Sequence, residues 1–271
     1  GPLLGENTSA VGGLNFNVGK SDKFRAGGDV KYAYTDMDLK EKSERQNFIS
    51  QNNTTFDNSI KDNRNKGHNL EMNYRILWNP NSLTQVEFRP NFKYSTSKMS
   101  NTSDTRSYEI DPLGDERDIT EGSLNSFSKA NGFNIGGRLS VSRKLKGKDG
   151  RQISLSLNYG YNDSKEDGYS YNNTIYHNSG TKEKTDLKDN NHSWGGSYGI
   201  RASYVEPINK HTTWSVSYNY RYNYTYADKL SYNINSDGSL GDLNIEYSNS
   251  FRNNFQRHRA STAFNGTYEK M

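Results

Sequence analysis

Residues 68–78 read HNLEMNYRILW, and apolar side chains alternate with polar ones along this stretch. Positions Leu70 and Trp78 begin and end the apolar series, and Asn69 and Arg75 bound the polar one. Because successive side chains of a β-strand project to opposite faces, each series must lie on one side of a sheet. After the turn sequence NPNS the alternation resumes over residues 84–94. The two stretches predict a β-hairpin.

The same pattern recurs along the whole chain. Short turns are predicted near Asp22, Asn81, Lys148 and Asn209, and the strands that they join are separated by long polar segments. These segments, rich in Asn, Ser, Asp, Thr and Lys, cover residues 38–66, 96–130, 163–191 and 228–254. Tight turns at one rim and long loops at the other are typical of a transmembrane β-barrel.

We therefore predict an all-β fold, an antiparallel transmembrane β-barrel of which about nine strands are present, the last over residues 255–268. The short turns would be periplasmic and the long loops extracellular. The odd strand number and residues 1–5, which contain neither an initiator Met nor the apolar core of a signal peptide, favour a partial barrel domain spanning residues 1–271. No plug domain is expected within it. The mean hydropathy of -1.08 does not oppose this prediction, because only half of each strand would face lipid.

Aromatic residues concentrate near the predicted strand ends. Trp78 and Trp214 lie near short turns, and Trp194 and Tyr226 lie towards the long loops. Since Trp and Tyr favour membrane interfaces, these four residues predict two lipid-facing girdles. As an alternative, the 20 tyrosines reflect β-propensity alone, and a soluble β-sandwich then remains open.

Charged side chains occupy the polar face of several predicted strands. The candidates for contact with a plug or a substrate are Arg75, Glu87, Arg89, Lys93, Arg138, Arg201 and Arg221. Half-buried charges of both signs need partners. Those partners could equally be water and one another in a polar lumen.

Several kinds of chemistry have no support in the sequence. There is no cysteine for a thiolate site or nucleophile, and the five histidines lack a metal-ligand spacing. Acidic residues between Glu109 and Asp118 could bind Ca²⁺ but lack EF-hand order, so a solvated loop is preferred. We predict no catalytic residue, cofactor or metal, hence no enzyme. The net charge of +4 gives no reason to expect a nucleic-acid partner.

Three stretches carry a family resemblance: GLNFNVG at 13–19, NRNKGHNL at 63–70, and NPNSLT at 79–84 followed by FRPNF at 88–92. The chain resembles the Bacteroidetes outer-membrane β-barrel family related to TonB-dependent receptors. The resemblance implies the cell outer membrane of a Gram-negative bacterium, with the lipid bilayer as a partner. In such relatives an N-terminal plug domain and a TonB-contacting segment precede the barrel, which closes with about 22 strands.

The function implied is that of a receptor or transporter, which binds a nutrient through extracellular loops and passes it through the barrel lumen. The alternative is a non-transport outer-membrane barrel with a structural or adhesin-like role. An upstream plug domain would favour the first of these functions.

Overall fold

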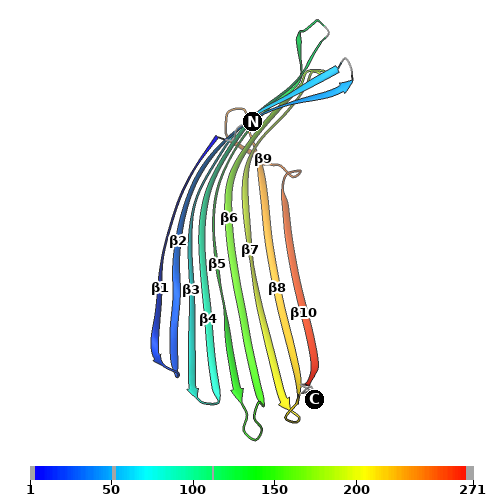
Figure 1. Ribbon diagram of the computed structural model, residues 1–271. Coiled ribbons are helices and arrows are strands. Elements are labelled where there is room, and N and C mark those ends of the chain that lie inside the picture. The colour runs from blue at the N-terminus through cyan, green and yellow to red at the C-terminus, as the bar shows by residue number, and fades with distance from the viewer. Residues whose placement is uncertain (1–3, 51–52, 112, 267–271) are drawn as a thin grey trace.

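The computed structural model describes residues 4–50, 53–111 and 113–266, and these residues form one antiparallel β-sheet (Figure 1). In chain order the strands are β1 (Leu4–Ser21), β2 (Phe24–Ser50), β3 (Asn53–Asn81), β4 (Thr84–Ile110), β5 (Glu116–Lys144), β6 (Gln152–Tyr176), β7 (Thr181–Pro207), β8 (Thr212–Ile234), β9 (Leu240–Leu243) and β10 (Asn249–Gly266). The described residues include no helix that could span a membrane.

The strands lie side by side in chain order from β1 to β8, and β10 follows β8. The predicted count of nine is wrong by one, because the segment 228–254 also contains the four-residue strand β9, which pairs only with β8. Four residues are too few for alternation to reveal a strand. The sheet is not closed, since β1 and β10 each pair with a single strand.

The short turns lie together at one end of the sheet, as predicted (Figure 1). Two of them are tight, at Asp22-Lys23 and Ser82-Leu83, and those after β5 and β7 are longer. In the turn after β5, Gly147 has a φ of 102°, a left-handed conformation that glycine adopts without steric cost. The last strand begins at Asn249, six residues before the predicted start, and residues 267–268 of the prediction lie outside the described residues.

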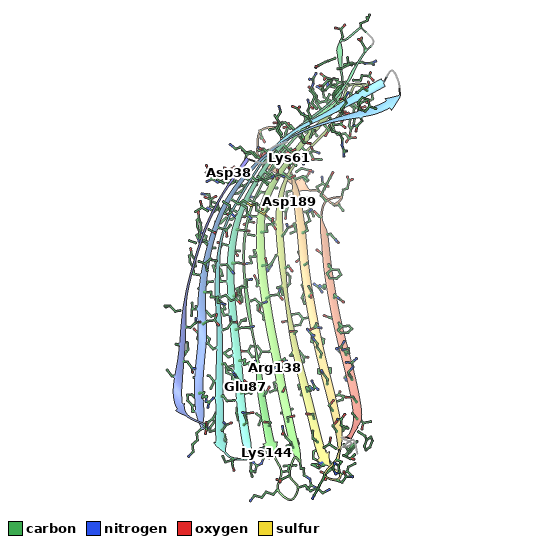
Figure 2. The ribbon with its side chains drawn as sticks, in the orientation of Figure 1. Asp38, Lys61, Glu87, Arg138, Lys144 and Asp189 are labelled. Carbon is green, nitrogen blue, oxygen red and sulfur yellow. The ribbon has the colours of Figure 1, made fainter. Side chains whose placement is uncertain are left out.

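The long polar segments are largely strand rather than loop. The 29 residues of β3 extend over about 95 Å at 3.3 Å per residue, whereas about 9–11 residues cross a membrane. At the end opposite the short turns, the β2–β3 and β4–β5 hairpins bend away from the rest of the sheet (Figure 1). We call the part of the sheet beyond Asp38, Lys61 and Asp189, on the side away from the short turns, the extension (Figure 2). The strands therefore continue as hairpins through these segments.

Backbone register gives the sheet one apolar and one polar face. Residues directly opposite each other on paired strands lie on the same face. One such row across the sheet contains Phe24, Trp78, Val86, Val141, Leu155, Ala202, Tyr218 and Ala260. These rows have no covering layer: Trp78 is 50% exposed and Tyr218 44%. Among the described residues, Leu187 is the buried large apolar side chain.

Glycines in the strands make room for rings on this apolar face. Gly28 lies opposite Tyr74, and a Cβ there would come within 2.5 Å of both the Tyr74 ring and the Asn73 carbonyl oxygen. Gly196 lies opposite Tyr224 in the same way, with ring carbons 2.7 Å from the position of a Cβ. A tyrosine thus fills the gap that each glycine leaves, so Gly28 and Gly196 allow close packing of rings on this face.

Candidate functional site

The seven charged candidates lie on the polar face of the sheet. Glu87, Arg89 and Lys93 alternate along β4, and Arg138 lies opposite Arg89 on β5. The row of Arg89 and Arg138 continues to Arg221 on β8, and the row of Glu87 continues to Arg201 on β7. Arg75 on β3 contacts Glu87. The sequence pattern placed them on one face correctly. Figure 2 shows Glu87 and Arg138 together between the short turns and the middle of the sheet.

Glu87 is the centre of an ion cluster that joins β3 to β4. Its Oε1 accepts hydrogen bonds from Arg75 Nε at 2.5 Å and from Arg89 at 2.8 Å. The Glu87 side chain is 21% exposed, whereas both arginine side chains are more than half exposed. One carboxylate therefore serves two arginines, and the cluster keeps a net positive charge.

Beyond this cluster the polar face becomes purely basic. Arg138 and Arg221 belong to one row, through Asn158 and Gly199, and the row ends at Arg257 on β10. The next row contains Arg201 and Arg259. Between the level of Trp214 and the level of Tyr226, the described residues of β5 to β10 place no carboxylate on this face.

Two pairs of arginines stand directly opposite each other across neighbouring strands. Arg89 faces Arg138, and Arg221 faces Arg257. Directly opposed like charges destabilise a sheet. Neutral amides provide part of the compensation, since Arg138 donates to Asn158 Oδ1 at 2.8 Å and Arg221 donates to Asn223 Oδ1 at 3.1 Å. The remaining positive charge suits an anionic group lying against this face.

A depression of about 630 Å³ adjoins the ion cluster around Glu87. Its lining includes Arg25, Arg75 and Arg89 together with the backbone of Gly27 and Gly28. Because Gly27, which lies opposite Arg75, carries no side chain, the guanidinium groups have space around them. The depression can hold a small polar or anionic group.

The four predicted girdle residues lie on the apolar face at two levels. Trp194 and Tyr226 stack with ring centroids 5.3 Å apart and planes 10° apart. At the short-turn level, Trp214 Nε1 donates to Thr262 Oγ1 at 2.7 Å, and Trp78 lies opposite Phe24. Each ring has an apolar body with a polar edge, as a residue at an interface requires.

Ion pairs reinforce both ends of the sheet. Glu206 accepts two hydrogen bonds from Arg151 at 2.7 Å, and others from Lys148 and Tyr204, which ties the turn after β5 to the end of β7. The Arg151 guanidinium, followed by Tyr204 and Lys148, holds the pKa of Glu206 well below its usual range. Just before the extension, the nearby Lys66 ammonium lowers the pKa of Asp36.

Sequence reasoning missed two members of the basic rows, Arg257 and Arg259. Their alternation along β10 was visible, but their place beside Arg221 and Arg201 depends on the pairing of β10 with β8. Comparison of the chain with protein-family models, with curated proteins and with solved structures finds no match.

Proposed function

We propose that this chain is part of an outer-membrane β-barrel receptor or transporter of the TonB-dependent type in a Gram-negative bacterium. Its apolar face would contact lipid, and its polar face would line the lumen. The observation that carries the proposal is an uncovered apolar face bounded by two aromatic levels. Exposed apolar patches of this extent mark a membrane or a partner surface.

The height of the apolar band fits a membrane. Trp214 and Tyr226 are 12 residues apart on β8, or about 40 Å along the strand at 3.3 Å per residue. On β3 the stretch from Leu70 to Trp78, which carries the apolar series, is nine residues long, within the range of about 9–11 residues that a tilted strand needs.

Strand stagger supports the same geometry. The strand β2 begins at Phe24, and the row of directly opposed residues that contains Phe24 reaches β8 at Tyr218. Since β8 begins at Thr212, this row meets β8 six residues after its start. The short-turn rim therefore moves by six residues over six strand-to-strand steps. One residue of 3.3 Å per 4.8 Å step gives a slope of about 35°, at the lower end of the 35–45° tilt that closes a barrel. With this tilt, the 40 Å on β8 becomes about 32 Å across the bilayer, close to its hydrocarbon thickness of about 30 Å.

Edge strands give a further reason for a larger barrel. β1 and β10 each leave one side of their backbone unpaired, and unpaired N–H and C=O groups are costly in lipid. Additional strands of the same protein would pair with both edges and close the sheet.

The basic polar face favours a receptor or transporter over an open structural barrel. The repulsion between directly opposed arginines such as Arg89 and Arg138 is reduced when carboxylates lie against them. A plug domain with acidic side chains, or an anionic substrate, would provide those carboxylates or equivalent charges. The long extensions β2–β3 and β4–β5 are compatible also with an adhesin-like display barrel.

Membrane fractionation of the full-length protein that contains this chain tests the location. We expect recovery in the outer membrane and a gel mobility that changes on heating, as for closed barrels. A soluble product with unchanged mobility would overturn the proposal and favour a β-sandwich.

Site-specific photocrosslinking then distinguishes a receptor from a display barrel. A photoreactive residue at Ser140, on the polar face, should crosslink to a plug domain of the same polypeptide, and one at its neighbour Leu139, on the apolar face, should crosslink to lipid. If Ser140 gives no protein crosslink while Leu139 still labels lipid, the display barrel is favoured.

A further inference from the structure

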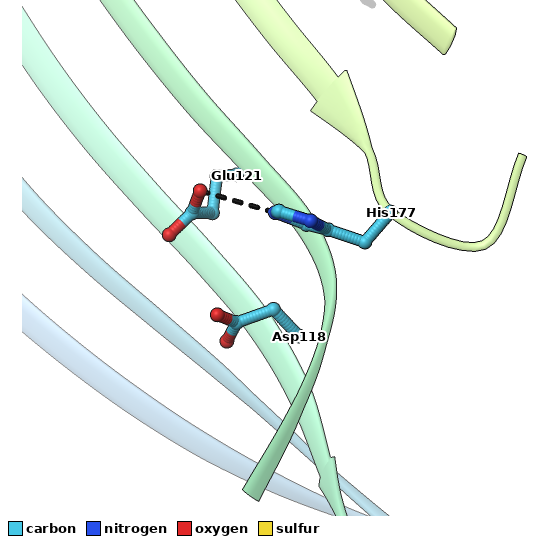
Figure 3. Close-up of side chains that lie close together, drawn as sticks. All are labelled: Asp118, Glu121 and His177. Atoms are coloured by element: carbon cyan, nitrogen blue, oxygen red, sulfur yellow. Dashed lines mark hydrogen bonds and ion pairs between the residues drawn. The ribbon is translucent and has the colours of Figure 1, made fainter. Parts of the chain in front are cut away.

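A cluster of metal-ligand types lies in the extension, far from the basic rows. Asp118 and Glu121 belong to β5, and His177 is the first residue after β6. One potential ligand atom from each lies within 4.8 Å of the other two. Figure 3 shows the two carboxylates close together, with the His177 ring beside Glu121.

A β-bulge brings the two carboxylates together. Thr120 pairs with Ser107 and Asp118 with Tyr108, so Ile119 has no partner on β4. In regular strand, residues three apart face opposite sides of the sheet. The extra residue interrupts this alternation, and Asp118 and Glu121 can therefore approach the same point.

The histidine is held at this bulge by the backbone. The His177 N–H donates to the Ile119 carbonyl oxygen at 2.9 Å, and His177 Nε2 lies 3.1 Å from Glu121 Oε2. His177 is thus fixed opposite the irregular residue of β5.

Arg106 orients the second carboxylate. Its Nε donates to Asp118 Oδ1 at 2.7 Å, and its other nitrogen donates to Glu116. Oδ2 of Asp118 can serve as a ligand while Oδ1 stays bound to Arg106. Hydrogen bonds to a ligating carboxylate are a common feature of metal sites.

We propose that Asp118, Glu121 and His177 bind a divalent transition-metal ion, for which Zn²⁺ is the test ion. Two carboxylates and one imidazole are ligands that Zn²⁺ accepts, and a three-ligand set leaves a position for water. Ca²⁺ and Mg²⁺ prefer all-oxygen sites, so the imidazole selects against them. The bound ion would tie β5 to the turn after β6. This inference does not rest on the membrane proposal, because binding depends only on these three side chains.

Zinc titration of the full-length protein tests the site. Calorimetry in metal-free buffer, on protein without a histidine tag, should show one Zn²⁺ per chain, and a large excess of Ca²⁺ should not compete. His177→Asn and Glu121→Gln should each weaken binding by about 100-fold or more, because losing a ligand costs more than the 10–100-fold typical of an outer hydrogen-bond partner. Arg106→Gln should weaken it by about 10-fold.

His192→Asn is the matched control. His192 Nε2 lies 3.0 Å from Asp163 Oδ2, a pair with the same chemistry but outside the three-residue cluster. This variant should bind Zn²⁺ as the wild type does. Zinc should also slow hydrogen exchange of the His177 amide in the wild type and leave it unchanged in Glu121→Gln. Equal binding by His177→Asn and wild type, or an equal loss in His192→Asn, would overturn the proposal.

Discussion

Replacing Tyr220 with arginine tests the membrane assignment of the apolar face. Tyr220 is the central residue of the alternating series from Trp214 to Tyr226 on β8, six residues from either end. At 3.3 Å per residue and a slope of about 35°, it lies about 16 Å from each aromatic level, near the expected midplane of the bilayer.

The expected cost is about 2–4 kcal/mol in free energy of unfolding, which is the range for an arginine on the lipid face at the midplane. Tyr220 also contacts two rings, with centroids 4.9 Å from His258 and 6.1 Å from Tyr198. Tyr220→Ala removes these contacts without adding a charge. The difference between the arginine and alanine variants therefore isolates the cost of the charge.

The assay is equilibrium unfolding by denaturant of the full-length protein folded into lipid vesicles. Ser217→Arg is the polar-face control, because Ser217 lies among Ser203 and Ser261 with no charge opposite it. Tyr226→Arg, at the interface, should cost about 0–1 kcal/mol. Equal costs for Tyr220→Arg and Ser217→Arg, or a larger cost at Tyr226 than at Tyr220, would refute the assignment.

Two further predictions concern stability. Gly28→Ala should lower the free energy of unfolding by about 1–3 kcal/mol, because the new Cβ would lie 2.5 Å from a backbone oxygen. At Gly12 a new Cβ would have no atom within 4 Å, so Gly12→Ala should change this free energy by about 1 kcal/mol or less. Denaturant midpoints that move equally in the two variants would contradict this. Since its partners lower the pKa of Glu206 from 4.5, the stabilisation by Glu206 is complete above about pH 5 and declines as the pH falls below 4.5. The stability difference between wild type and Glu206→Gln should thus be smaller at pH 3 than at pH 7, and an equal or larger difference at pH 3 would be inconsistent with it.

Much of the sheet could be predicted because a strand repeats every two residues. In residues 68–78 the alternation alone identifies the strand, its two faces and the position of Arg75 on the polar one. Turn residues around Asp22 and Asn81 then fix where each hairpin reverses. This local information sufficed for the nine long strands, but β9 was too short to carry a pattern.

The sequence by itself determined which face each strand residue occupies, while the tertiary structure decided which residues meet across strands. Arg221 lies beside Arg257 only because β10 pairs with β8 over residues 212–229, whereas the short β9 pairs only with the far end of β8. Asp118 and His177 meet only through a bulge in β5 and the register of β5 with β6. Alternation is a property of neighbouring residues, whereas register and bulges depend on the balance of hydrogen bonds and side-chain packing between segments far apart in the chain.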